Sequence, residues 1–158
     1  MERTVLLRLF GALANEGVAY VLVGGVAVNL HGVVRATEDV DIFVRPSDDN
    51  VARLKAALKA TFADDPDIDE IAACDLRGAY PVIRYVPRDG SLTLDVIARL
   101  GARFAFDDLE ATPRDLDGVL VSLATPRTLH RMKRDTARAI DAQDAARLRS
   151  AFDLEDDE

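Results

Sequence analysis

The fold is decided by residues 23–44, which read VGGVAVNLHGVVRATEDVDIFV. The end of this stretch predicts a strand over Val40–Val44. Successive side chains of a strand point to opposite faces, so Asp39 and Asp41 point to the same side. Two neighbouring carboxylates repel each other unless a cation neutralises them. Carboxylate oxygens with open positions beside them suit Mg²⁺, which also binds substrate phosphates and water.

A pair of glycines precedes these acids by some fourteen residues. Gly24 and Gly25 follow the apolar run Val18–Val23, which predicts a buried strand, and precede a predicted helix at Val26–Leu30. Backbone N–H groups at such a turn can approach an anion closely because glycine has no Cβ in the way. We therefore expect a phosphate site and a cation site to meet over one edge of a sheet.

A third acid stands in the middle of an apolar strand. Asp95 lies in the sequence Leu94-Asp95-Val96-Ile97, where a charged side chain needs a partner. In a mixed sheet this strand can lie beside the strand of Asp39. Three carboxylates can then hold two metal ions that activate an attacking hydroxyl and stabilise a leaving pyrophosphate. The sequence thus predicts Asp39, Asp41 and Asp95 as catalytic metal ligands, with Mg²⁺ or Mn²⁺ as the cofactor.

The remaining segments predict a mixture of helices and strands. Predicted helices cover Arg3–Asn15, a segment that begins after Ser47 and contains Val51, Leu54, Leu58 and Phe62, a segment opened by Thr125-Pro126, and Asp141–Phe152. Further predicted strands cover Ile68–Ala73, Tyr80–Val86, Leu92–Ala98 and Val119–Leu123. Asp89-Gly90 predicts a hairpin between two of them. We expect an α/β (α+β) fold, a mixed β-sheet with helices packed on it, as a single domain over residues 1–158.

The composition and charge fit a cytoplasmic protein. The 158 residues are 49% hydrophobic, and no apolar run is long enough to span a bilayer, so we expect no membrane partner. The net charge of -8 argues against general nucleic-acid binding. A local contact remains open at Arg127–Arg149, which holds seven Arg or Lys residues against three Asp, although such a stretch is often only a solvated helix face. We expect the acidic tail, residues 153–158, to be solvated or frayed, Cys74 to fill core space, and His130 to lie at the surface.

These motifs resemble the nucleotidyltransferase superfamily of DNA polymerase β-like enzymes. Its members share Gly-Ser or Gly-Gly, a spacer, Asp-x-Asp, and a later single Asp on a strand. The version here is most similar to the AbiEii branch, which includes toxins of type IV toxin–antitoxin systems, some of which attach nucleotides to the acceptor end of tRNA. The residues that carry this likeness are Gly24-Gly25, His31-Gly32, Arg35, Thr37 and Asp39-x-Asp41, followed by a C-terminal pattern at Lys133, Arg138, Asp141 and Asp144.

The resemblance implies a reaction and roles for individual residues. It implies a nucleotidyltransferase-like fold and transfer of an NMP group from an NTP to an acceptor hydroxyl, with release of pyrophosphate. Asp39 and Asp41 bind both metal ions, and Asp95 binds the catalytic one. The residues expected to bind substrate or phosphate are Gly24, Gly25, Arg35, Thr37, Lys133, Arg138 and Asp144. The implied partners are an NTP, an RNA or tRNA 3′ end, and a cognate antitoxin protein.

Two positions depart from the family pattern. Gly25 stands where many members have Ser, whose hydroxyl bonds a phosphate oxygen. In this chain the backbone must make that bond instead. Ile140 fills a place where the branch often has Lys. Structural roles also stay open: Gly24-Gly25 as a tight turn, and Arg35 as an ion-pair partner of Glu38 or Asp39.

Other functions remain open as well. A degenerate fold of this kind can serve as a nucleotide-binding or interaction module. An active enzyme can use a small molecule or a protein as its acceptor. A hydrolase can use the same metal ions with water as the acceptor.

Overall fold

The structure, a computed structural model, describes residues 1–155. Residues 156–158, the end of the acidic tail expected to be frayed, lie outside the described residues. In the described part of that tail, Asp153 ends the last helix in a left-handed conformation, with φ of 51°. The backbone N–H of Leu154 then donates to the carbonyl oxygen of Arg149 at 3.1 Å.

Helices and strands alternate over residues 3–61, and most of the strands then follow before the last two helices. In order they are α1 (Arg3–Asn15), β1 (Tyr20–Val23), α2 (Gly24–Leu30), β2 (Asp39–Val44), α3 (Asp48–Thr61), the 3-10 helix η1 (Pro66–Glu70), α4 (Ala73–Leu76), β3 (Val82–Tyr85), β4 (Thr93–Ile97), β5 (Arg99–Leu100), β6 (Phe104–Ala105), the 3-10 helix η2 (Phe106–Asp108), β7 (Ala111–Leu116), β8 (Val119–Ala124), α5 (Pro126–Lys133) and α6 (Ala139–Phe152).

Six of the strands form one mixed sheet in the order β3-β4-β2-β1-β8-β7. Strand β2 pairs antiparallel with β1 and parallel with β4, while β5 and β6 form a separate hairpin. This order confirms that the strand of Asp95 lies beside the strand of Asp39 and Asp41. The expected mixed sheet with helices packed on it is also confirmed.

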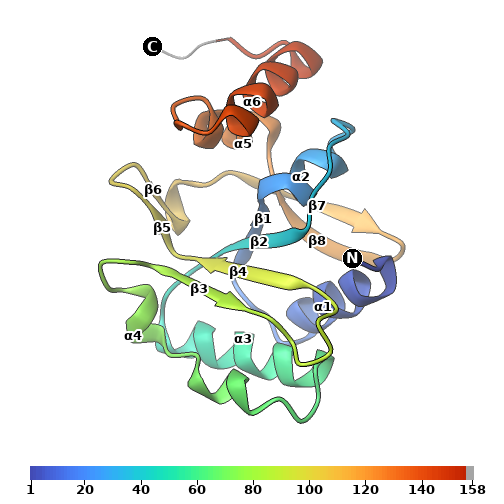
Figure 1. Cartoon of the computed structure of the whole chain (residues 1–158), viewed down its shortest axis with the longest axis vertical. Helices are drawn as coiled ribbons and strands as arrows, with labels where there is room; N and C mark the ends of the chain where they lie inside the picture. Colours follow the sequence, from blue (N-terminus) through green and yellow to red (C-terminus); the bar gives the residue numbers. More distant parts are fainter. Residues whose placement is uncertain (156–158) are drawn as a thin grey trace.

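Helices cover both faces of this sheet (Figure 1). Helices α1 and α3 pack together on one face, whereas α2, α5 and α6 lie on the other. Val40 and Ile42 of β2 are fully buried. Because side chains alternate along a strand, Asp39 and Asp41 point to the opposite face, toward α5. No helix within residues 1–155 is long and apolar enough to cross a lipid bilayer.

Most of the predicted elements are confirmed, with boundaries that differ by a few residues. The predicted caps are present: Ser47 Oγ accepts from Asn50 N at 3.2 Å, and Thr125 Oγ1 accepts from Thr128 N at 3.2 Å. The predicted hairpin at Asp89-Gly90 joins β3 and β4 in an antiparallel pair.

Three expectations about local structure are wrong. The strand predicted at Ile68–Ala73 is instead a 3-10 helix followed by α4, because Pro66 begins the turn and Asp65 caps it by accepting from Asp67 N at 3.0 Å. Ile68 is still fully buried, which explains the apolar character of the segment. Cys74 is exposed on α4 and does not fill the core, and His130 is buried on α5 and does not lie at the surface.

Strand β7 has no counterpart among the predicted strands. Its residues are almost all exposed at the edge of the sheet, so they lack the alternation of apolar and polar side chains that marks a half-buried strand. It also contains Pro113, which sheets tolerate mainly in edge strands.

Candidate active site

An open cleft of about 820 Å³ lies between the sheet and α5. Its lining comes from β1, α2, the loop before β2, strands β2 to β5, helix α5, the connection to α6 and the first turn of α6. These residues are Val23, Gly24, Gly25, Arg35, Ala36, Thr37, Glu38, Asp39, Asp41, Arg84, Asp95, Ile97, Leu100, Leu129, Met132, Lys133, Thr136, Arg138 and Asp141. The cleft thus gathers every site residue predicted from the sequence except Asp144, which lies behind its wall.

The three predicted acids lie together on one side of the central strands. Asp41 is directly opposite Asp95 in the parallel register of β2 and β4, and Asp39 precedes Asp41 by two residues on β2. Burial, followed by the negative charges of Asp95 and Asp39, raises the pKa of Asp41 from 3.8 to about 6, against a smaller opposing effect of Lys133. A carboxyl group with this pKa sits where a negative charge is costly without a further cation.

The glycine pair brings the backbone against this acid site. Gly24 has φ of +71°, and a Cβ at this position would overlap the carboxylate of Asp41. A Cβ on Gly25 would lie 2.7 Å from Oγ1 of Thr37 and 3.2 Å from Cζ of Arg35. The pair begins α2, and no side chain caps that first turn. The first N–H groups of a helix have no acceptor within it, so these groups can receive an anion from the cleft.

A buried ion-pair cluster closes the other side of the cleft. The ammonium of Lys133 lies 3.0 Å from Asp141 Oδ1 and 3.0 Å from Asp144 Oδ2. Thr136 Oγ1 donates to the other oxygen of Asp141 at 2.9 Å. An ammonium has three N–H donors, so these two acids leave one donor of Lys133 for a ligand in the cleft.

Asp144 belongs to this cluster and not to the cleft surface. Its side chain is 1% exposed, and Nη1 of Arg35 donates to its Oδ2 at 2.6 Å. Asp144 therefore holds Arg35 and Lys133 in position, which differs from the direct substrate contact predicted for it. Arg35 thus has an ion-pair partner other than Glu38 or Asp39, the two that were left open as alternatives to a phosphate role. Arg138 is 74% exposed, with Nη1 3.9 Å from Asp141 Oδ2.

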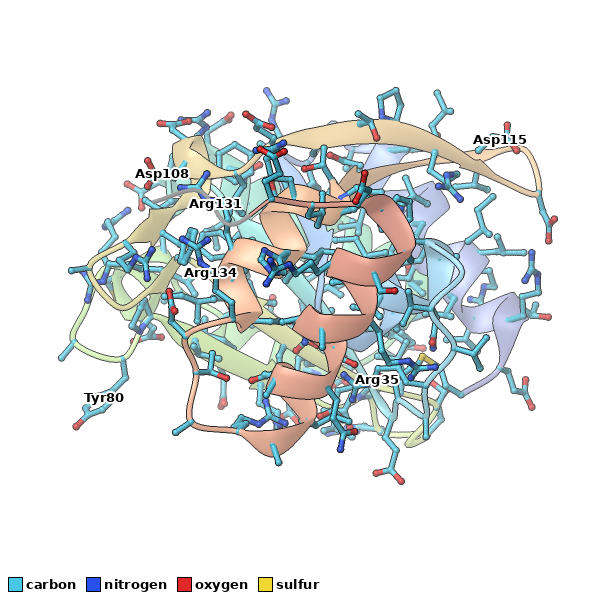
Figure 2. All side chains as sticks on the ribbon, turned by 90° about the horizontal axis from the view of Figure 1, so that it is seen from above. Arg35, Tyr80, Asp108, Asp115, Arg131 and Arg134 are labelled. Carbon is cyan, nitrogen blue, oxygen red and sulfur yellow. The ribbon has the colours of Figure 1, made fainter. Side chains whose placement is uncertain are left out.

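Figure 2 shows arginines on both sides of the α5–α6 pair. Arg35 lies next to α6, to which its bond with Asp144 ties it. Arg131 and Arg134 lie on the far side, toward β5 and β6, where Cζ of Arg131 is 5.9 Å from the ring centroid of Phe104. Within the basic stretch Arg127–Arg149, Arg131 and Arg134 therefore lie on this far side, whereas Lys133 is buried in the cleft wall.

Arg84 is a charged residue of the cleft that the sequence analysis missed. It lies on β3, directly opposite Asp95 in the antiparallel register with β4. Its Nε and Nη2 donate to Asp95 Oδ1 at 2.9 Å and Oδ2 at 3.0 Å. These hydrogen bonds raise the pKa of the guanidinium. An arginine in an apolar strand is the same kind of signal that identified Asp95, and the hairpin at Asp89-Gly90 fixes the pairing of the two.

The chemistry of this donor set fits a hard divalent cation. The cleft presents carboxylates and no His or Cys among its lining residues, and Mg²⁺ prefers oxygen ligands. As the side chains stand in residues 1–155, no group of three or more His, Cys, Asp or Glu residues is arranged to hold a metal ion. The guanidinium of Arg84, which also lies 3.5 Å from Asp39 Oδ2, provides the positive charge there.

One wall of the cleft is apolar. It is formed by Ile97 and Leu100 at the end of β4 and on β5, and by Leu129 and Met132 on α5. Because Ile97 follows Asp95 by two residues on the same strand, this wall begins next to the acids. The cleft thus combines charged and apolar side chains, a combination that suits a ligand with an anionic group and a flat hydrophobic one.

A family model described as "Nucleotidyl transferase AbiEii toxin, Type IV TA system" matches residues 7–117, a span that contains the glycine pair and the three acids. Among solved structures, the chain is similar to the crystal structure of an antigenic nucleotidyltransferase-like protein from Paracoccidioides brasiliensis. The two share 20% sequence identity with a TM-score of 0.58, over 92% of this chain and 73% of that chain. A search of curated proteins found no match.

Proposed function

The chain belongs to the AbiEii family of nucleotidyl transferase toxins from type IV toxin–antitoxin systems, and from this premise we propose a specific reaction. The protein transfers an NMP group from an NTP to the hydroxyl at the 3′ end of an RNA, with tRNA as the preferred acceptor. The transfer depends on Mg²⁺ or Mn²⁺. The observation that supports this reaction best is the common cleft of three acids, the glycine pair and Lys133.

The proposed roles follow from the positions of the side chains in the cleft. Asp39, Asp41 and Asp95 hold the divalent ions. When bound, these ions activate the attacking hydroxyl and stabilise the negative charge on the leaving pyrophosphate. The oxygen of the acceptor hydroxyl forms a bond to the α-phosphorus, the bond from this phosphorus to the pyrophosphate oxygen breaks, and the hydroxyl proton is released.

The triphosphate contacts come from groups on both sides of the acids. Backbone N–H groups of Gly24 and Gly25 receive phosphate oxygens without interference from a Cβ. The hydroxyl of Thr37 occupies the space into which a side chain at Gly25 would project and donates to the carbonyl oxygen of Asp39 at 3.2 Å, so the backbone supplies the contact that many family members take from Ser. Lys133 contributes its remaining N–H donor. The apolar wall receives the nucleobase.

Exposed positive charge supports RNA as the acceptor. Arg138 and Arg84 lie on the cleft lining with side chains that are 74% and 63% exposed, so they are accessible to a phosphate backbone. The net charge of -8 confines such a contact to this region. The family also supports a cognate antitoxin as a protein partner.

The decisive experiment offers the protein each α-labelled NTP with Mg²⁺ and total RNA. We expect label on tRNA. The variant Asp41→Asn should reduce transfer by roughly a thousandfold, because it removes a metal ligand and with it several kcal/mol of transition-state stabilisation. Asp49→Asn, an exposed acid on α3 on the opposite face of the sheet, should transfer label as the wild type does.

Other outcomes of the same experiment identify the alternative functions. NTP binding without transfer to any acceptor indicates a nucleotide-binding module. Free labelled nucleotide without labelled RNA indicates a hydrolase. Label on a small molecule or a protein contradicts the RNA acceptor and leaves the transfer reaction intact.

Asp41 also gives a prediction about stability without metal. Its pKa is raised from 3.8 to about 6 in the folded state, so folding opposes its ionisation. The unfolded state then binds fewer protons than the folded state between these values, and the free energy of unfolding falls by up to about 3 kcal/mol as the pH rises through this window. In EDTA at pH 8, Asp41→Asn should therefore be more stable than the wild type by roughly 1–2 kcal/mol.

Urea unfolding at pH 4 and pH 8 checks this expectation. The gain should disappear at pH 4, where the wild-type carboxyl group is protonated. Glu38→Gln, which neutralises an exposed acid on the same cleft, should produce no comparable gain. An equal gain from both variants would mean that the net charge of the protein, and not the burial of Asp41, sets the effect.

A further inference from the structure

The contact between Arg84 and the acids has the geometry of a strong ion pair. Both oxygens of Asp95 accept hydrogen bonds from the same guanidinium, at 2.9 and 3.0 Å, and Asp39 lies 3.5 Å from it. Paired, parallel hydrogen bonds of this kind are among the strongest between side chains. Two of the three acids that would hold a metal ion therefore share one guanidinium of the chain itself as a counter-ion.

This pairing competes with metal binding. Mg²⁺ requires carboxylate oxygens at roughly 2.0–2.1 Å in a nearly octahedral arrangement, and a guanidinium bonded to both oxygens of Asp95 takes up part of the space and of the lone pairs that this arrangement needs. The positive charge of Arg84 also repels a cation at this distance. The absence of a ready group of metal ligands in residues 1–155 agrees with this conflict.

The two partners differ in their freedom to move. Asp95 is 13% exposed and lies on β4, between two neighbouring strands. The side chain of Arg84 is 63% exposed and comes from β3, which is an edge strand. A long, exposed side chain can change its rotamer without disturbing the sheet, so Arg84 is the partner that can leave.

We infer that Arg84 is a built-in counter-ion that competes with the divalent cation for Asp95 and Asp39, and that metal binding releases its guanidinium into the cleft. Arg84 keeps the acids together without metal and makes metal binding weaker than the acids alone would allow. The released guanidinium lies on the same lining as the glycine pair, where it is available to the phosphates of a substrate. The inference rests on the proposed function because it assigns these acids to a metal ion.

Calorimetric titration with Mn²⁺ alone, without NTP or RNA, tests the competition. Arg84→Gln should bind Mn²⁺ about tenfold more tightly than the wild type, because no ion pair has to be broken. Arg84→Lys, which keeps a charge and loses the paired hydrogen bonds, should bind with an intermediate affinity. Arg88→Gln is the matched control, since Arg88 has a similar exposure of 65% and lies in the same hairpin but outside the cleft. Its affinity should equal that of the wild type.

Side-chain NMR of the wild type supplies a second measurement. If Arg84 had only a structural role, its resonance would not change on addition of metal. The Nε–H resonance of Arg84 should shift when saturating Mg²⁺ is added, because its hydrogen bond to Asp95 breaks. The resonance of Arg77, which is paired with Asp48 on the surface at 3.2 Å, should stay unchanged.

Equal or weaker Mn²⁺ binding by Arg84→Gln overturns the inference, as does an unchanged Arg84 resonance at saturating Mg²⁺. If Mn²⁺ binds neither protein, the inference is also wrong. These results are independent of the transfer assay. If the wild type and Arg84→Gln bind Mn²⁺ equally and transfer is intact, only the competition is rejected. If Arg84→Gln binds Mn²⁺ more tightly but no acceptor is labelled, only the proposed reaction is rejected.

Discussion

Replacing Gly24 with alanine is expected to reduce nucleotidyl transfer by at least about a hundredfold. The new Cβ would overlap the carboxylate of Asp41, so either this acid or the start of α2 has to move. A displacement of about 1 Å at a reacting centre is enough for such a loss. The residue also has φ of +71°, a conformation that costs an L-amino acid roughly 1–2 kcal/mol.

Gly32→Ala distinguishes the effect of the overlap with Asp41 from the effect of backbone strain. Gly32 has φ of +88°, yet no atom lies within 4 Å of the position of its Cβ. The variant Gly32→Ala should therefore lose roughly 1–2 kcal/mol of unfolding free energy and keep its transfer rate within about threefold of the wild type. Transfer by both variants can be measured with labelled NTP at a temperature where each is folded. A similar loss in both would mean that backbone strain, and not the contact with Asp41, limits the reaction.

Asp144→Asn is expected to destabilise the protein by about 3 kcal/mol. The substitution hardly changes the shape of the side chain, but it removes the negative charge between Arg35 and Lys133. These cations lie 2.6 and 3.0 Å from Asp144 Oδ2, and their side chains are only 16% and 10% exposed. Removing one partner of a buried ion pair leaves an uncompensated charge, which is the costly case.

Asp135→Asn provides the comparison for this variant. Asp135 lies in the connection between α5 and α6 and also pairs with arginines, but its side chain is 57% exposed. Exposed ion pairs contribute about 0–1 kcal/mol, so its unfolding free energy in urea should change little. Equal effects of the two substitutions would contradict a special role for the buried cluster.

The core of the site could be predicted from the sequence because it depends on local rules. Strand periodicity alone puts Asp39 and Asp41 on one side, and an acid within an apolar strand marks Asp95. The pairing of Arg84 with Asp95 was also accessible, since a hairpin centred on Asp89-Gly90 places these two residues opposite each other. It was missed because only the acids in the strands were considered.

Other contacts depend on packing that no local pattern encodes. Arg35 and Asp144 are 109 positions apart, and their bond forms only because α6 lies over the loop before β2. The burial of Ile68 by a 3-10 helix follows from Pro66 and the cap at Asp65, which outweigh the apolar run that favours a strand. Strand β7 pairs only with β8, so its solvated residues carry little sign of a strand.

The sheet order has a consequence for synthesis of the chain. Strand β1 is translated well before β8, one of its two neighbours in the sheet, which is complete only at residue 124. Lys133 and the acid that secures it, Asp144, come later still. A nascent chain on the ribosome therefore contains Asp39, Asp41 and Asp95 well before it contains the cleft that gathers them.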